Sequence, residues 1–134
     1  MSARVCGIRG ATTVQENTPE AILGATTELL TELMRTNGFQ AGDVASAFFT
    51  TTRDLNAEFP AVAANRMGWT DAALLCGHEM DVPGSLAMCL RVLLHVNTEK
   101  QQRELNHIYL RGAKALRPDR ANHPEEERTE AKSP

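Results

Sequence analysis

A single segment of the chain, between Thr18 and Gly38, has the pattern of a long amphipathic helix. Thr18 is a hydroxyl N-cap, Pro19 suits the first helical position, and Glu20 places an acid in the first turn. Residues suited to a buried stripe recur at helical spacing, at Ile22, Thr26, Leu29 and Leu33. Because one helix can cover only one face of a β-sheet, a sheet built from the remaining chain must turn its second face toward water or another subunit.

Most of the remaining chain has the composition or the alternation of β-strands. The predicted strands are Arg4–Val14, Val44–Thr52, Ala72–Cys76, Leu86–Asn97 and His107–Arg111, and the short apolar run at 72–76 is typical of a buried strand. Short helical turns are expected at 59–68 and 100–105, and a tight turn at 82–85. This order predicts an α+β domain with a small mixed or antiparallel β-sheet and one long helix.

The segment Leu86–Asn97 fits a helix or a strand by its apolar content, and its alternation favours the strand. The aliphatic residues that would share one face are Leu90, Val92, Leu94 and Val96. A strand therefore turns Arg91 to the opposite face.

The length of 134 residues corresponds to about one domain. Residues 1–117 carry the predicted elements and form the expected domain. Residues 118–134 are polar, charged and proline-bearing with almost nothing to bury, so disorder is expected there.

Composition excludes several classes of protein. No apolar run approaches the roughly 18 residues of a membrane span, and the N-terminal residues lack the apolar core of a signal peptide. A net charge of −3 argues against a general nucleic-acid binder. The 3 cysteines form no CxxC pair, which favours a reducing, cytoplasmic setting. The 4 histidines fit no metal-ligand spacing, and no phosphate-binding glycine motif is present, so no metal or cofactor is expected.

Five polar residues lie in apolar or strand-like surroundings and are candidates for function: Arg9, Glu79, Arg91, Tyr109 and Arg117. An isolated buried charge is costly, so each needs a partner or a ligand. One interpretation pairs Glu79 with an arginine and leaves the others solvated; the alternative is a binding site.

Cys76 and His78 are two residues apart in a predicted strand and could suggest a thiol nucleophile. Spacing alone gives no hydrogen-bond geometry, and a buried structural cysteine is the commoner case.

Several separated motifs resemble one family when they are taken together. They are Gly7–Thr13, Asp54–Ala61, Glu79–Leu86, Cys89–Leu93, Asn97-Thr98, His107–Leu110 and Leu116–Asp119. In this order they resemble the monofunctional chorismate mutases of the Bacillus type, the AroH family. The resemblance extends in register from about residue 4 to residue 119, and the number of motifs makes it specific.

The resemblance implies a homotrimer in which three small mixed sheets pack into a pseudo-α/β barrel, with active sites in the clefts between subunits. It implies the conversion of chorismate to prephenate, a Claisen rearrangement in phenylalanine and tyrosine biosynthesis. No metal, cofactor or covalent intermediate is implied.

The resemblance also implies roles for individual residues. Arg91 matches the arginine that faces the breaking ether oxygen, and Glu79 and Cys76 match the groups that contact the ring hydroxyl. Arg9 and Tyr109 match the pair that binds a substrate carboxylate.

Three apolar residues match the family's pocket lining, namely Phe59, Leu74 and Leu75. Arg117 matches the mouth of the pocket, where the C-terminal segment can close. The sequence departs from the family at the entrance, because Val62 and Asn65 stand where many members carry a charged residue and an arginine. The resemblance therefore does not extend to the charged residues that would attract the substrate to the entrance.

Two other classes of function compete with the mutase. One is a trimeric small-molecule-binding or imine-deaminase-like protein on a related fold, and the other is a purely structural interaction domain. Loss of chorismate absorbance on adding the purified protein, without cofactor, separates the three hypotheses.

Overall fold

The structure is a computed structural model that describes residues 3–116, so Arg117 and the predicted tail at 118–134 lie outside the described residues. The helices and strands follow in the order β1 (Arg4–Thr13), α1 (Pro19–Asn37), β2 (Val44–Thr51), α2 (Ala61–Arg66), β3 (Ala73–His78), β4 (Cys89–Thr98) and β5 (Ile108–Tyr109). The expected α+β class, with a small mixed sheet and one long helix, is confirmed.

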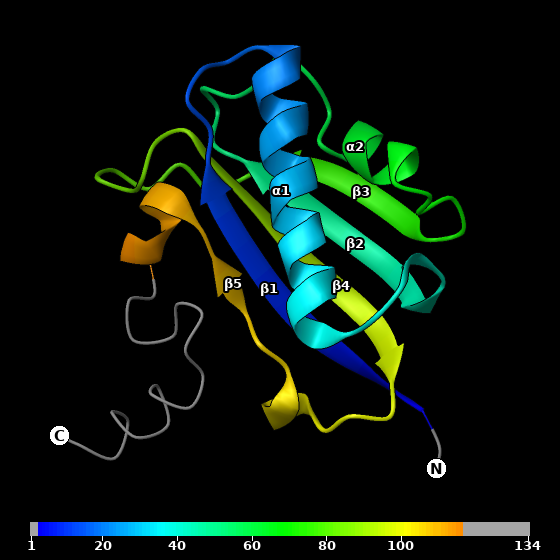
Figure 1. The fold of residues 1–134 in the computed structure, drawn as a ribbon. Coiled ribbons are helices and arrows are strands. Elements are labelled where there is room, and N and C mark those ends of the chain that lie inside the picture. The colour runs from blue at the N-terminus through cyan, green and yellow to red at the C-terminus, as the bar shows by residue number, and fades with distance from the viewer. Residues whose placement is uncertain (1–2, 117–134) are drawn as a thin grey trace, which may run out of the picture.

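The strands form one 5-stranded sheet in the order β3-β2-β4-β1-β5. The central strand β4 pairs antiparallel with both β1 and β2, whereas β3 and β5 add parallel to the two outer flanks. The connection from β1 through α1 to β2 therefore leaves a gap that β4 fills, and α1 crosses one face of the sheet (Figure 1).

The helix α1 begins and ends where the sequence predicts. The Thr18 hydroxyl accepts a hydrogen bond from the Ala21 amide at 3.1 Å, and Gly38 closes the helix in the left-handed conformation with φ of 71°. At Gly10 the helix packs so closely on β1 that an added Cβ would lie 2.9 Å from the Leu33 Cδ1 atom. A small residue is therefore needed where α1 crosses the sheet.

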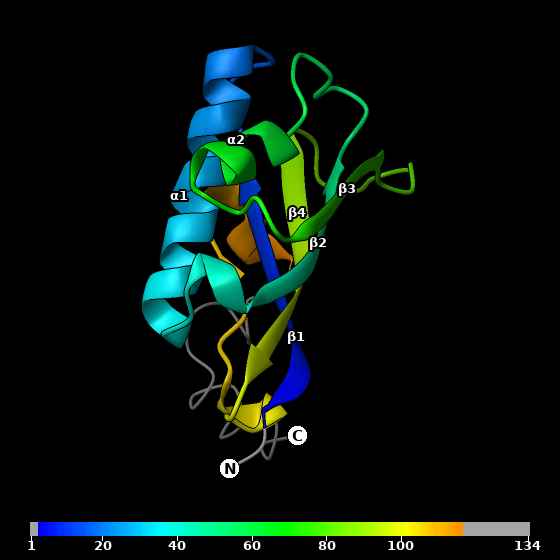
Figure 2. The ribbon, with the colours of Figure 1, turned by 90° about the vertical axis from the view of Figure 1, so that its right-hand side faces the viewer.

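Both α-helices lie on the same side of the sheet (Figure 2), and the opposite face carries only the short 3₁₀ helix Arg111–Ala115 among the described elements, packed at one end through Ala113 against Ala11 and Tyr109. In β4 the predicted aliphatic row faces α1 and is buried, while Arg91 and Leu93 lie on the other face. Several large apolar side chains are exposed on this other face: Val5, Phe48, Leu75 and Leu93. We call it the open face. The expectation that one face of the sheet lacks a helical cover is confirmed.

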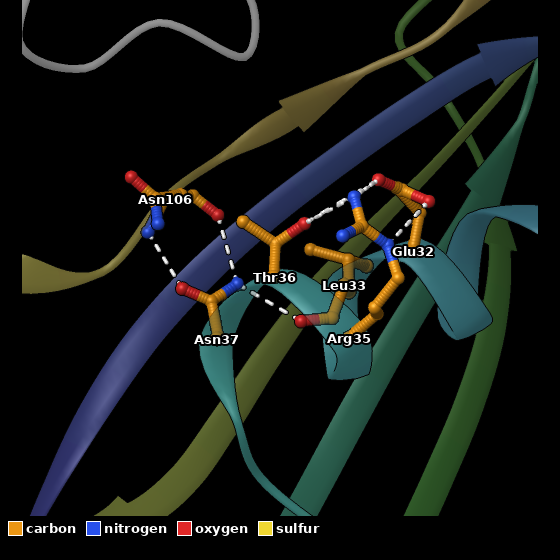
Figure 3. A network of polar contacts seen from close by, with 6 residues as sticks. All are labelled: Glu32, Leu33, Arg35, Thr36, Asn37 and Asn106. Atoms are coloured by element: carbon orange, nitrogen blue, oxygen red, sulfur yellow. Dashed lines mark hydrogen bonds and ion pairs between the residues drawn. The ribbon is translucent and has the colours of Figure 1, made fainter.

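The C-terminal end of α1 is tied to the segment that leads into β5. The buried Asn37 side chain donates hydrogen bonds to the carbonyls of Leu33 and Asn106 at 3.0 Å each, and its Oδ1 accepts the Asn106 amide at 2.7 Å (Figure 3). Lys100 Nζ donates to the Asn37 carbonyl at 2.8 Å. This network fixes the approach of β5 to the sheet.

Three strand predictions need correction. The segment 72–76 is part of β3, which is an edge strand rather than a buried one, and Leu75 is 65% exposed. β4 begins only at Cys89, because Met88 before it has a positive φ of 52°. The predicted strand at 107–111 shrinks to the two residues of β5, because Arg111 also has a φ of 52° and starts a 3₁₀ helix.

No helix among residues 3–116 is long and apolar enough to cross a membrane.

We predict that Asn37→Ala destabilises the fold by about 1–3 kcal/mol, because it leaves the half-buried Asn106 amide and two carbonyls without their partner. Urea unfolding at matched protein concentration measures the change. The control is Thr27→Ala on the exposed side of the same helix, which should stay within about 0.5 kcal/mol of the parent. Equal effects of the two substitutions would contradict a structural role for the Asn37 network.

Candidate active site

Strand register brings three of the predicted site residues together on the open face. Arg91 in β4 lies between Ala11 of β1 and Thr50 of β2. Tyr109 of β5 pairs beside Ala11, and Arg9 lies two residues earlier on β1, on the same face. Residues far apart in the chain thus meet because of the antiparallel pairing of β1 with β4 and the short parallel pairing with β5.

Glu79 joins this group from the end of β3. Its amide donates to the Thr51 carbonyl at 2.8 Å, which holds the residue just beyond the strand. Its Oε2 atom lies 3.3 Å from Arg91 Nε, so the predicted pairing of Glu79 with an arginine is present. The Arg91 Nε atom is nevertheless buried without a hydrogen bond in the described part of the chain. The two atoms are close, but they do not form a hydrogen bond, so the N–H of Arg91 Nε is left without an acceptor. A buried donor without an acceptor costs free energy.

A hollow of about 330 Å³ surrounds these groups. Its lining includes Arg9, Phe48, Thr50, Glu79, Arg91, Tyr109 and Leu116. This lining contributes two guanidinium groups and one carboxylate, so the hollow suits an anion.

A second pocket, of about 320 Å³, lies at the other side of the β3 edge and contains Phe59 and Cys76. Phe59 is 68% exposed, and the pocket also includes Glu58 and His78. The Cys76 side chain shares its sheet face with Phe49, which faces α1, so it lies away from Glu79 and Arg91. Within one chain the two groups predicted to contact one ring hydroxyl, Glu79 and Cys76, therefore belong to different cavities.

Burial raises the pKa of the Cys76 thiol, and a hydrogen bond with the Ala61 backbone only partly offsets that rise. A thiol with a raised pKa is a poor nucleophile near neutral pH, because the thiolate is the reactive form. The structure thus favours Cys76 as a contact residue over a covalent catalyst.

Two further predicted residues lie outside both cavities. Leu74 packs against the core beneath β3, and Leu75 lies exposed on the open face beside Phe48. Both assignments to the pocket lining stay predictions. At the predicted entrance, Val62 and Asn65 lie on α2, where Asn65 is exposed.

The hollow around Arg91 is also lined by three residues for which the sequence alone predicts no role, namely Phe48, Thr50 and Leu116. Alternation in the strand Val44–Thr51 would have put Phe48 and Thr50 on one face, but only the register shows that this is the face of Arg91. Leu116 reaches the hollow because Arg111 forms two hydrogen bonds with Glu28 of α1, at 3.0 and 3.1 Å, and so holds the start of the last 3₁₀ helix.

No group of three or more His, Cys, Asp or Glu side chains is placed to hold a metal ion within residues 3–116.

The protein is a small α+β protein whose sheet is covered by helices on one face. The other face carries two arginines, a carboxylate and a tyrosine around one hollow, an arrangement suited to an anionic ligand. The sequence model of the chorismate mutase type I family matches residues 5–120. The chain belongs to this family, as the resemblance implied.

Two curated relatives and one solved structure are similar to the chain. The chorismate mutase AroH of Thermus thermophilus is 49% identical over 116 residues, covering 86% of this chain and 95% of the relative. That of Bacillus subtilis is 42% identical over 114 residues, covering 84% and 90%. A solved chorismate mutase from Clostridium thermocellum is 53% identical with a TM-score of 0.81, covering 82% of this chain and 98% of that chain.

We predict that alkylation of Cys76 by iodoacetamide is slower at pH 7 than that of a free cysteine and still accelerates above pH 9. The reason is its raised pKa, which lowers the thiolate fraction at neutral pH. Peptide mapping over a pH series measures the rate at each cysteine, and Cys76→Ser identifies the peptide. A rate that reaches its plateau below pH 8 would mean an activated thiolate instead.

Proposed function

We propose that the hollow around Arg91 is where this chorismate mutase converts chorismate to prephenate, and that a neighbouring subunit completes the site. The observation that carries the proposal is the buried Arg91 Nε, which makes no hydrogen bond within residues 3–116 although it lies beside Glu79. A buried donor held without a protein partner is stabilised when a ligand supplies the acceptor.

The ether oxygen of chorismate is the acceptor that this donor fits. Negative charge grows on that oxygen as the carbon–oxygen bond breaks, so a fixed cation beside it stabilises the transition state more than the substrate. Glu79, 3.3 Å from Arg91 Nε, holds the guanidinium in place and offers an oxygen to the ring hydroxyl. The rearrangement moves no proton to solvent, so the site needs no acid–base pair.

The second task of the site is orientation. Chorismate is a dianion whose flexible enolpyruvyl arm must lie over the ring before the new carbon–carbon bond can form. Arg9 and Tyr109 line the same hollow as Arg91 and are proposed to hold a carboxylate. Confinement of the arm over the ring by the site as a whole lowers the barrier by up to several kcal/mol, because orientational freedom is lost on binding rather than in the chemical step. The contacts of Arg9 and Tyr109 with the carboxylate itself add binding that is equal in the substrate complex and in the transition state.

A single subunit supports only part of the proposed site. Phe59 and Cys76 lie in the pocket beyond β3, and Leu75 stands 65% exposed on the open face. These groups reach one substrate together with Arg91 when the pocket of one subunit meets the hollow of the next. The exposed apolar residues of the open face, Val5, Phe48 and Leu93 among them, are covered in the same step. We therefore propose a homotrimer with open faces turned inward.

The proposed function also covers the predictions for Arg117, for the domain bounds and for the location of the protein. Arg117 is proposed to close the mouth of the site next to Leu116, which already lines the hollow, and residues 1–117 are the proposed catalytic domain. The free thiols of Cys6, Cys76 and Cys89 support a reducing, cytoplasmic location.

We predict that Arg91→Ala lowers kcat by about 10²–10³-fold with a much smaller change in KM, as expected for a donor that acts mainly in the transition state. Arg91→Lys should recover only part of the rate, because it keeps the charge and loses the planar guanidinium. Chorismate absorbance gives both constants for variants whose fold and size match the parent by circular dichroism and sizing.

Arg103→Ala is the matched control, because Arg103 is exposed in the 3₁₀ helix Gln102–Glu104 and away from the hollow. A folded Arg91→Ala variant that keeps the kcat of this control would overturn the electrostatic role.

We predict that two inactive variants recover activity in mixed trimers. Arg91→Ala disables the hollow, and Phe59→Asp places a repelling carboxylate in the pocket beyond β3. In a random mixture, about one quarter of the sites combine an intact hollow with an intact pocket from a neighbour. Co-expression with two affinity tags isolates the mixed assemblies.

The matched control for this experiment is the combination of both substitutions in one chain, co-expressed with itself, which should stay inactive. Purified mixed trimers without activity would mean that the catalytic groups of each site come from one chain.

A further inference from the structure

The outer edge of β1, on the side away from β4, is only partly covered by another strand. β5 pairs with β1 at Gly10 and Ala11 alone, and the Leu110 amide donates to the Ala11 carbonyl at 2.9 Å. The preceding residues of β1, from Gly7 to Arg9, have no strand on this side among the described residues. Their outward backbone groups lie at an exposed edge, where side chains or water can pair with them.

Two side chains take the place of the missing strand. The amide group of Gln102 pairs with both backbone groups of Gly7, accepting from its N–H at 2.9 Å and donating to its carbonyl at 2.6 Å. The ring of His107 does the same for the next outward amide, because its Nδ1 atom accepts the Arg9 N–H at 3.0 Å. The outer edge of β1 is therefore paired with Gln102 at Gly7, with His107 at Arg9 and with β5 at Gly10 and Ala11.

The contact at Arg9 fixes the protonation state of His107. A backbone amide can only donate, so Nδ1 must present a lone pair to it. The ring is then neutral, with its proton on Nε2, because both nitrogens of a charged imidazole are donors. Histidine is suited to this place in a way that a lysine or arginine is not, since neither of those side chains can accept a hydrogen bond.

His107 also lies two residues before Tyr109, on a segment that the Asn37–Asn106 hydrogen bonds hold on its other side. The ring therefore joins the backbone that carries Arg9 to the short strand that carries Tyr109. Both residues line the hollow around Arg91, and β5 consists of only two residues.

We propose that His107 is a positioning residue: its neutral, Nε2-protonated ring sets Arg9 and Tyr109 at the spacing that receives one carboxylate of the substrate. This inference rests on the proposed function of Arg9 and Tyr109 in binding chorismate. The carboxylate does not change its charge during the rearrangement, so these contacts are equally strong in the substrate complex and in the transition state. Loss of the positioning contact therefore acts on KM rather than on kcat.

The kinetic experiment compares three variants in the full-length protein. His107→Ala removes the acceptor and should raise KM about five- to tenfold with kcat within about twofold of the parent. His107→Asn puts Oδ1, also bonded to Cγ, near the position of Nδ1 and should restore most of the loss. Gln102→Ala is the matched control, because it removes the same kind of contact from the same strand edge at Gly7, which has no side chain to place in the hollow. It should lower stability while KM stays unchanged.

A KM for His107→Ala equal to that of Gln102→Ala, or no rescue by Asn, would overturn the positioning role. A second measurement does not depend on any substitution being tolerated. Long-range ¹⁵N–¹H spectra of the protein labelled at histidine report the tautomer of each ring, and His107→Asn identifies the His107 signals. At neutral pH the proposal requires a protonated Nε2 and an unprotonated Nδ1 at His107; the other tautomer or a charged ring would overturn it.

Separate results test the substrate-binding role of Arg9 and the positioning role of His107. If Arg9→Ala leaves KM unchanged, the proposed role of Arg9 in binding the substrate is wrong. If Arg9→Ala raises KM and His107→Ala does not, the substrate site stands and only the positioning by His107 is wrong.

Discussion

The single long helix is the constraint on which the rest of the structure depends. α1 and α2 cover one face of a 5-stranded sheet, and the residues of that face, such as Leu94 and Phe49, are fully buried. Within residues 3–116 no α-helix covers the open face, where alternation turns every second residue outward. A chain with one helix of this kind therefore presents a flat surface that is partly apolar and partly charged. Such a surface suits assembly along its apolar part and ligand binding at its charged part.

The alternation of side chains along β4 also places Arg91 on the open face. Its neighbours Leu90 and Val92 are among the buried core residues, so the backbone around the arginine is held rigidly by hydrophobic packing on the other side of the sheet. In the proposed mechanism the guanidinium therefore stands on a strand whose other face is packed into the core. A preorganised donor of this kind contributes to catalysis because its orientation is fixed during folding. Glu79 supplies a counter-charge at 3.3 Å without hydrogen bonding to Arg91 Nε, and in the proposed function this N–H donates to the substrate.

The parts of the structure that the sequence predicts are those set by local pattern. Thr18 and Gly38 bound α1, and the aliphatic alternation in β4 correctly turns Arg91 away from the core. Motifs along the chain also identify the family before any geometry is known. What could not be predicted depends on contacts between distant segments. The run at 72–76 looks buried because it is apolar, although Leu75 faces outward at the sheet edge. Cys76 and Glu79 are three residues apart, a spacing that turns them to opposite faces of the sheet, but only the structure shows that each face carries a separate cavity.

The proposed division of the site between two cavities has a consequence for stability as well as for catalysis. In the proposed trimer each substrate molecule touches the hollow of one subunit and the pocket of the next, so it binds the assembly more tightly than the separated chain. Any ligand that prefers the assembled state stabilises that state by mass action. The open face contributes apolar area to the same equilibrium through Val5, Phe48 and Leu93. In the proposed trimer, hydrophobic burial then gives the subunits their affinity for one another. The charged groups of the hollow are costly to bury unpaired, so they favour an anionic ligand between the subunits.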